Sequence, residues 1–187
     1  MKRFLTIAAV AIAGSVAVSA QTQSAEIKPI SSGKFGIGLD GITTQNNLLL
    51  KYFVTENLAA QLIAGYDYSS VDGDAPSGQT KVDGSELRAG VSVLYHLSNA
   101  TISPYVGVEG LFTTKTEAGV FTTEPDPTNA LTASLVVGGE YFVHPMFSVG
   151  VKAQLGVKLD LERDIPVTPS KTSLFTATAV TARLYFN

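Results

Sequence analysis

His96 and Ser98 are the residues of this chain whose types and spacing most resemble a catalytic set. They lie two positions apart, and Glu109 follows downstream. A serine hydrolase needs a nucleophilic hydroxyl, a histidine base and a carboxylate that orients the histidine. On that hypothesis Ser98 is the nucleophile, His96 the base and Glu109 the orienting acid. The competing interpretation is a plain turn, because Ser98-Asn99 is a typical turn pair. We favour the turn and expect no enzymatic activity.

Ion-binding groups are equally sparse. Residues 71–74 read VDGD, and clustered carboxylates attract hard cations, but two are too few for a coordination shell. A solvated turn explains them better. The second histidine, His144, precedes a proline in another turn, and two separated histidines do not make a metal site. With no cysteine and a formal charge of −3, we expect no metal, no cofactor and no nucleic-acid partner.

The N-terminus has the pattern of an export signal. Lys2 and Arg3 precede an uncharged apolar run from Phe4 to Val18, and small residues follow up to Ala20. This pattern predicts a signal peptide over 1–20 that is removed by cleavage. We expect a short N-terminal segment at 21–32 and a single barrel domain at 33–187.

The remaining sequence alternates apolar and polar residues at the period of a β-strand. The clearest stretch runs from Phe147, with Val149, Val151 and Leu155 on one parity and Lys152 on the other. A period of two places these sets on opposite faces of a sheet. The same pattern predicts eight strands, several of them long enough to cross a bilayer at a tilt, at 33–42, 46–55, 58–69, 84–97, 102–115, 129–143, 146–160 and 172–187.

The connections between these strands alternate in length. Residues 54–58, 97–103 and 143–146 are tight turns, whereas 70–83, 116–128 and 161–171 are long, and 43–45 is a short exception. Short turns at one rim and long loops at the other are typical of an outer-membrane barrel, with the long loops outside the cell. The long connections carry an acidic excess: Asp72, Asp74, Asp83, Glu117, Glu124, Asp126, Glu162 and Asp164 against Lys81, Arg163 and Lys171.

Periodicity alone leaves open whether the apolar face lines the inside of a soluble, lipocalin-like barrel or faces lipid. The polar parity carries charges on nearly every strand among small residues, which suits a crowded lumen. Rings also recur at strand ends, as membrane interfaces favour. We therefore predict an all-β fold, an eight-stranded antiparallel up-and-down transmembrane β-barrel with an N-terminal signal peptide.

Three segments carry a resemblance to a known group: KYFVTENLAAQLIAGY, ISPYVGVEG and EYFVHPMFSVGVKAQLGV. They resemble the strand–turn–strand units of small outer-membrane β-barrels of the OmpX/OmpA-transmembrane-like group. The resemblance implies location in the cell outer membrane and recognition of the C-terminal strand by the barrel-assembly machinery. Such proteins commonly end on an aromatic residue, whereas Asn187 follows Phe186 here. The sequence H-x-S-N at His96 is also similar to the motif of outer-membrane lipid A deacylases, but its turn is expected on the periplasmic side, away from the outer leaflet.

The inward parity contains six acids and six bases. In a narrow eight-stranded lumen these charges should pair, because an unpaired buried charge is costly. Paired charges predict a lumen plugged by side chains, and the competing interpretation is a narrow polar path. The predicted lumen charge network comprises Asp40, Lys51, Asp67, Glu86, Arg88, Glu109, Lys115, Glu140, Lys152, Lys158, Asp160 and Arg183.

A ring pair recurs near the strand ends: Tyr52-Phe53, Tyr95-His96, Tyr141-Phe142 and Tyr185-Phe186. The apolar parity predicts an interface girdle of Tyr52, Tyr95, Tyr141 and, because the register shifts in the last strand, Phe186. We expect a structural or surface-interaction role with outer-membrane lipid and lipopolysaccharide as neighbours and an unknown external ligand. The alternatives are a small-solute channel and a lipid A-modifying hydrolase that uses His96 and Ser98.

Overall fold

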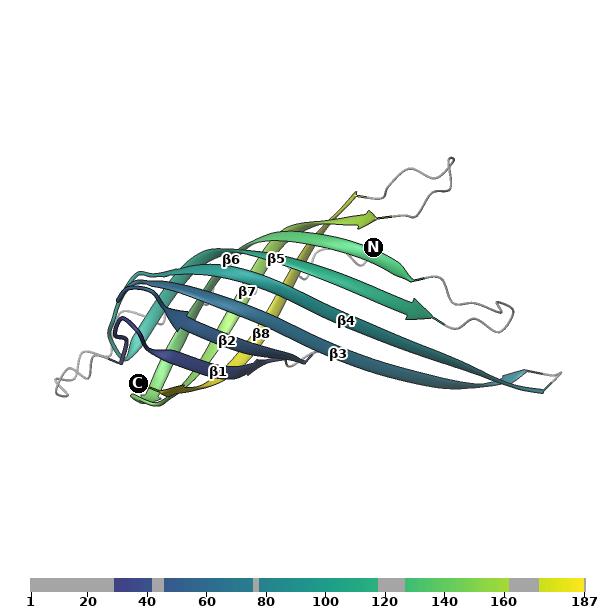
Figure 1. Ribbon diagram of the computed structural model, residues 1–187, viewed down its shortest axis with the longest axis horizontal. Helices are drawn as coiled ribbons and strands as arrows, with labels where there is room; N and C mark the ends of the chain where they lie inside the picture. The colour runs from purple at the N-terminus through teal and green to yellow at the C-terminus, as the bar shows by residue number, and fades with distance from the viewer. Residues whose placement is uncertain (1–28, 42–45, 76–77, 118–126, 162–171, 187) are drawn as a thin grey trace, which may run out of the picture.

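The computed structural model describes residues 29–41, 46–75, 78–117, 127–161 and 172–186. These residues form a closed antiparallel barrel in which each strand pairs with its sequence neighbours and β1 pairs with β8 (Figure 1). The predicted fold class is confirmed. The strands are β1 Phe35–Asp40, β2 Asn47–Phe53, β3 Leu58–Ala75, β4 Gly78–His96, β5 Ile102–Glu117, β6 Thr128–His144, β7 Phe147–Leu161 and β8 Thr172–Phe186.

The barrel is polar inside and apolar outside. Lys51 and Arg183 are almost fully buried in the lumen, whereas Leu135 on the outer wall has an exposed fraction of 62%. A soluble barrel would bury its large apolar side chains, since exposed apolar surface in water is unfavourable. An apolar outer wall instead fits a lipid environment, which decides between the two orientations of the alternating pattern.

No helix in the described part of the chain is long and apolar enough to cross a membrane.

The two ends of the barrel differ (Figure 1). We call the end with the three short turns, the start of β1 and the end of β8 the turn end. We call the opposite end, to which β3 and β4 extend, the hairpin end. The predicted connection at 70–83 is wrong, because pairing between β3 and β4 continues out to Ala75 and Gly78. Asp, Gly and Ser clusters indicate loops, but a hairpin that reaches beyond an apolar band can be polar and still satisfy its backbone with ladder hydrogen bonds.

Two other predicted features change with this register. The VDGD segment lies inside β3, where Asp72 is directly opposite Lys81 on β4, and not in a turn. The first two strands are shorter than predicted, at six and seven residues. The predicted signal peptide, the connection at 43–45 and most of the long connections at 116–128 and 161–171 lie outside the described residues.

Candidate functional site in the barrel lumen

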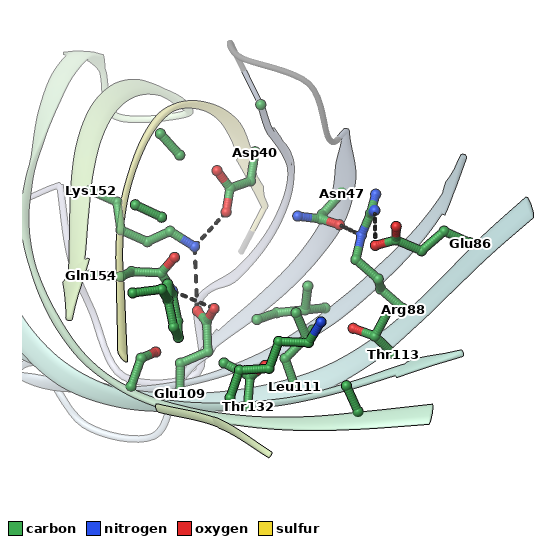
Figure 2. Close-up of a pocket in the computed structure, with 18 of the residues that line it drawn as sticks. Asp40, Asn47, Glu86, Arg88, Glu109, Leu111, Thr113, Thr132, Lys152 and Gln154 are labelled. Carbon is green, nitrogen blue, oxygen red and sulfur yellow. Dashed lines mark hydrogen bonds and ion pairs between the residues drawn. The ribbon is translucent and has the colours of Figure 1, made fainter. Parts of the chain in front are cut away.

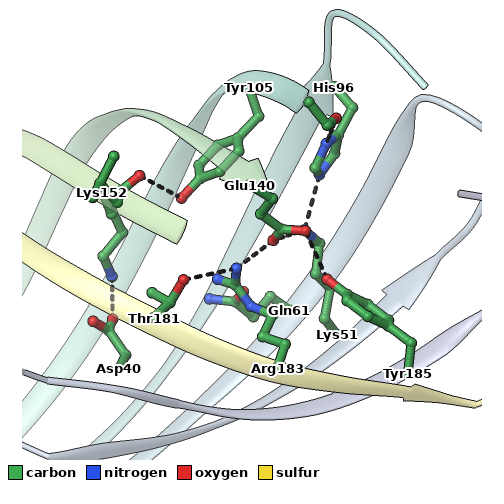
Figure 3. Close-up of polar contacts among 12 residues, drawn as sticks. Asp40, Lys51, Gln61, His96, Tyr105, Glu140, Lys152, Thr181, Arg183 and Tyr185 are labelled. Atoms are coloured by element: carbon green, nitrogen blue, oxygen red, sulfur yellow. Dashed lines mark hydrogen bonds and ion pairs between the residues drawn. The ribbon is translucent and has the colours of Figure 1, made fainter. Parts of the chain in front are cut away.

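The turn end of the lumen is crossed by a buried ion cluster from three strands. The Glu140 carboxylate of β6 forms ion pairs with Lys51 of β2 and Arg183 of β8, and its Oε1 lies 2.7 Å from Lys51 Nζ. The Tyr185 hydroxyl donates to the second carboxylate oxygen at 2.8 Å (Figure 3). All three charged side chains have exposed fractions of 0–1%. Because removal of two cations and one carboxylate from water is costly, only this mutual pairing makes their burial tolerable.

His96 continues this cluster toward the turns. Its Nε2 lies 2.8 Å from Lys51 Nζ, and its Nδ1 lies 2.6 Å from the Ser103 hydroxyl. Ser103 donates its own proton to the carbonyl of Ser98 at 2.5 Å. His96 Nδ1 must therefore carry the proton that Ser103 accepts, and Nε2 accepts from the Lys51 ammonium.

This arrangement does not assemble the hypothetical hydrolase set. The Ser98 hydroxyl accepts from the backbone N–H of Ala100 at 3.2 Å, as in a turn. Glu109 contacts Lys152 and Gln154 in another part of the lumen. Both ring nitrogens of His96 are occupied by Lys51 and Ser103. The sequence spacing suggested a catalytic set, but the folded barrel gives His96, Ser98 and Glu109 different partners.

An aromatic layer lies beside the ion cluster. Phe53, His96, Tyr105, Phe142 and Tyr185 come from five different strands, and successive ring centroids lie 5.1–5.9 Å apart. The Lys51 ammonium lies 4.8 Å from the Phe53 ring centroid and 5.5 Å from that of Tyr105, within cation–π distance. The rings and the ion cluster together form what we call the seal.

Glycines make room for the rings of the seal. A Cβ atom at Gly36 would lie 2.5 Å from the Tyr185 ring, and one at Gly138 would lie 2.6 Å from Tyr105. Both glycines belong to the inward parity, and each pairs with its tyrosine on the neighbouring strand, so the absence of a side chain leaves room for the ring.

The segment before β1 covers the seal at the turn end. Ile30 is buried in the same cluster as Phe53, Phe142 and Tyr185. The Lys34 ammonium donates to the carbonyls of Pro29 and Pro145, each at 2.5 Å. Burial lowers the pKa of Lys34 from its ordinary value, while the two carbonyls supply acceptors for the charged form. The sequence analysis assigned no role to the segment 21–32. In the structure its last residues cover the lumen at the turn end.

A second ion cluster lies farther along the lumen. Lys152 of β7 contacts Asp40 of β1 at 2.5 Å and Glu109 of β5 at 3.3 Å. The Gln154 side-chain amide donates to Glu109 at 2.5 Å. These residues form the inner floor of a lumen cavity of about 510 Å³ that occupies the rest of the barrel toward the hairpin end (Figure 2). We call this cavity the vestibule.

The remaining predicted lumen charges lie nearer the hairpin end. Arg88 pairs with Asp67 at 2.6 Å and Glu86 at 2.9 Å, and Asn47 accepts from Arg88 at 2.9 Å. Lys158 pairs with Asp160 at 3.3 Å. The backbone position of Lys115 is directly opposite that of Glu86. The acids here have exposed side-chain fractions of 21–34%, against 0% for Glu140. Water access therefore increases from the seal toward the hairpin end.

Eleven of the twelve predicted lumen charges fall into four groups of ion pairs: the seal cluster, the floor cluster, the Arg88 cluster and the Lys158 pair. The twelfth, Lys115, is opposite Glu86 in the strand register. The alternating pattern assigns a residue to the lumen but does not give its position along the barrel axis, so the sequence could not separate these groups. Sequence reasoning also missed the uncharged partners Asn47, Gln61, Ser103, Tyr105, Gln154, Thr181 and Tyr185. The repeated ring pair was the available signal for the aromatic layer.

Each ring pair divides across the barrel wall. Tyr52, Tyr95, Tyr141 and Phe186 point outward with exposed fractions of 45–51%, whereas their neighbours Phe53, His96, Phe142 and Tyr185 point inward and are buried. Phe35 is directly opposite both Tyr52 and Phe186 and adds an outward ring that the sequence analysis did not include. One dipeptide thus supplies both the outward ring and a ring of the seal.

Within the described strands and turns, no three His, Cys, Asp or Glu side chains gather in a way that could hold a metal ion.

Comparisons with known proteins agree with the fold. The model of the OmpW family matches residues 7–170. OprG from Pseudomonas aeruginosa, an outer membrane protein, is similar at 13% identity and a TM-score of 0.53, covering 86% of this chain and 99% of that one. Outer membrane protein W of E. coli is similar at 13% identity and 0.51, covering 84% and 99%. The N-terminal β-barrel domain of Pseudomonas aeruginosa OprF is similar at 14% identity and a TM-score of 0.52, covering 83% of this chain and 98% of that one. A comparison with curated proteins gave no match.

Proposed function

The chain belongs to the OmpW family and lies in the outer membrane, and from that premise we propose that it is a non-enzymatic surface barrel with a sealed base. Its role on this proposal is structural or interactive: a vestibule open to the cell exterior contacts external molecules, while the seal keeps the membrane impermeable. The turn end faces the periplasm and the hairpin end faces outward, since short turns are periplasmic in such barrels.

The observation that carries the proposal is the seal. Lys51, Glu140 and Arg183 link three strands across the lumen, with exposed fractions of 0–1%. The aromatic layer lies beside them, and Ile30 is buried in the same cluster as its rings. An ion that crossed this region would have to displace a paired ion cluster and the rings beside it. Eight-stranded barrels have interiors that side chains can fill, so such closure is physically reasonable.

The neighbours of the barrel follow from its outer wall. The outward rings are suited to a girdle at the membrane interface, and the apolar wall between them contacts outer-membrane lipid and lipopolysaccharide. The assembly machinery recognises β8, whose ring Phe186 points outward. An enzymatic role is not part of the proposal, because His96 and Ser98 have structural partners.

Ion conductance tests the proposal. Purified protein in a planar bilayer is expected to show no stable conductance steps, because the seal leaves no continuous water column. The triple variant Phe53→Ala, Phe142→Ala, Tyr185→Ala removes rings from the seal without removing its carboxylate and is expected to conduct. Reproducible steps of uniform size from the unaltered protein would reject the sealed lumen.

A small-solute channel remains a second candidate because of one observation. Ile63 and Leu111 border the vestibule and also a groove of about 650 Å³ on the outer wall. Their side chains separate the lumen from the membrane, so a solute could leave sideways without passing the seal. Leu111→Trp would thicken this partition. If expression of the protein increased uptake of a small apolar solute and Leu111→Trp abolished that increase, the channel would replace the sealed barrel as the favoured function.

A further inference from the structure

Polar side chains from five strands line the vestibule: Asp40 of β1, Asn47 of β2, Arg88 of β4, Glu109 of β5, and Lys152 and Gln154 of β7 (Figure 2). Contacts among these side chains fix the orientation of the two amides. One Gln154 amide N–H is directed at Glu109, and the Asn47 carbonyl oxygen accepts from Arg88. The lining of the cavity therefore includes a donor, the amide nitrogen of Asn47, and an acceptor, the amide oxygen of Gln154.

The charges around the vestibule are nearly balanced. Its basic side chains each have an acidic neighbour: Lys152 with Asp40 and Glu109, Arg88 with Asp67, and Lys158 with Asp160. The backbone of the fourth, Lys115, is directly opposite Glu86. A charged ligand would lose its hydration shell without meeting a charge excess of opposite sign. The electrostatics therefore favour a neutral ligand that can form many hydrogen bonds.

Apolar side chains interrupt the polar lining at separate points. Phe175 of β8 borders the cavity, and so do Ile63 of β3 and Leu111 of β5. A Cβ atom at Gly156, on the neighbouring strand, would lie 2.7 Å from the Phe175 ring, so the ring rests against that bare stretch of wall. The serine and threonine hydroxyls of β5 and β6, such as Thr113 and Thr132, lie at other points of the lining. The cavity thus offers an aromatic surface among donors and acceptors.

We propose that the vestibule binds a small neutral saccharide. A pyranose ring is uncharged, has hydroxyl groups around its edge and presents a face of C–H groups to an aromatic ring. Those properties match the balanced charge, the amides of Asn47 and Gln154, and the ring of Phe175. The volume of about 510 Å³ falls within the range of roughly 300–1,000 Å³ that is usual for small-molecule sites. The same chemistry could come from a soluble sugar or from the headgroup of a surface glycolipid.

The test is an NMR titration of the full-length barrel in micelles of an alkyl dimethylamine-oxide detergent, whose headgroup contains no sugar. Glucose and maltose are the probes, and gluconate, protonated glucosamine and cyclohexanol are the comparison solutes. Saturable shifts at millimolar sugar are expected in the amides that border the vestibule, with weaker binding of the three comparison solutes. Absence of saturable sugar shifts, or tighter binding of either charged analogue than of glucose, would overturn the proposal.

Variants locate the site. Gln154→Met keeps the side-chain length but removes one polar partner, and is expected to raise the Kd about fivefold, the effect of roughly one hydrogen bond. Phe175→Ala is expected to raise it by roughly threefold to tenfold. Thr176→Val is the matched control, since Thr176 is exposed on the outer wall beside Phe175 and should leave the Kd unchanged. Equal Kd values in all three variants would show that the sugar binds elsewhere.

A second arm separates the two sources of sugar. In nanodiscs that contain lipopolysaccharide, shifts of the vestibule amides that free maltose reverses would identify a glycolipid headgroup as the occupant. Shifts that only free sugar produces would identify a soluble saccharide. The vestibule lies on the outer side of the seal, so failure of sugar binding leaves the sealed lumen intact. Conductance by the unaltered protein, in turn, would not contradict sugar binding.

Discussion

Replacement of Glu140 by leucine is expected to lower the free energy of unfolding by about 3–5 kcal/mol, the largest effect of any single substitution in the lumen. The variant leaves Lys51 and Arg183 buried without their shared carboxylate. It also removes the acceptor of the Tyr185 hydroxyl. An uncompensated buried charge costs more than the ion pair itself contributes, because the charge cannot return to water.

The measurement is urea unfolding in lipid vesicles, followed by circular dichroism and by the heat-dependent mobility of the folded barrel on gels. Glu86→Leu is the matched control, since Glu86 has an exposed side-chain fraction of 21% and should lose much less stability. The triple variant Lys51→Met, Glu140→Leu, Arg183→Met should recover most of the loss, because it leaves no unpaired charge. If Glu140→Leu were as stable as the unaltered barrel, the ion cluster would not hold the seal together.

Gly138→Ala is expected to destabilise the barrel by about 1–3 kcal/mol, as overpacking of a close-packed site does. The added Cβ would lie 2.6 Å from the Tyr105 ring and also collide with the backbone carbonyl of Val151. The carbonyl cannot move without disturbing the ladder between β6 and β7, and the Tyr105 ring must turn away to relieve the second clash. Movement of Tyr105 would also disturb its ring contact with His96, whose centroid is 5.3 Å away.

Gly110→Ala provides the control for that substitution. A Cβ atom at Gly110 would meet nothing within 4 Å, and alanine in a strand is usually more favourable than glycine by roughly 0.5–1 kcal/mol. The same chemical change should therefore destabilise at position 138 and be neutral or stabilising at position 110, measured as the shift in urea midpoint. Equal effects at both positions would mean that the seal is not closely packed around Tyr105.

Much of the architecture follows from the sequence because an outer-membrane strand alternates strictly. Lys152 and Val151 are neighbours, and their opposite character already assigns one to the lumen and one to the lipid. The tight turns near Asn57 and Ser98 then fix which strands are adjacent. The prediction of β3 and β4 failed in length, because polar residues such as Asp72 were attributed to a loop when they continue a paired hairpin.

The contacts of the candidate site were harder to predict from the sequence than the fold. Lys51 and Glu140 are far apart in the chain, and their contact depends on the stagger of strands around the whole barrel. Parity gives the face of each residue, but only the complete register gives its height. The Lys34 contacts with Pro29 and Pro145 come from a segment before the first strand, where no periodic pattern exists to guide a prediction.

The most direct test of the sealed lumen uses single cysteines, since the chain has no cysteine of its own. Ser148→Cys places a thiol beside the seal, because Ser148 is directly opposite Arg183 in the strand register and has an exposed fraction of 0%. Thr132→Cys places a thiol in the vestibule. Intact cells are treated with a membrane-impermeant maleimide, and folded barrel is analysed for the label. We predict that Thr132→Cys reacts from outside whereas Ser148→Cys reacts only after unfolding. Rapid labelling of Ser148→Cys on intact cells would contradict a lumen that is open to the exterior and sealed at its base.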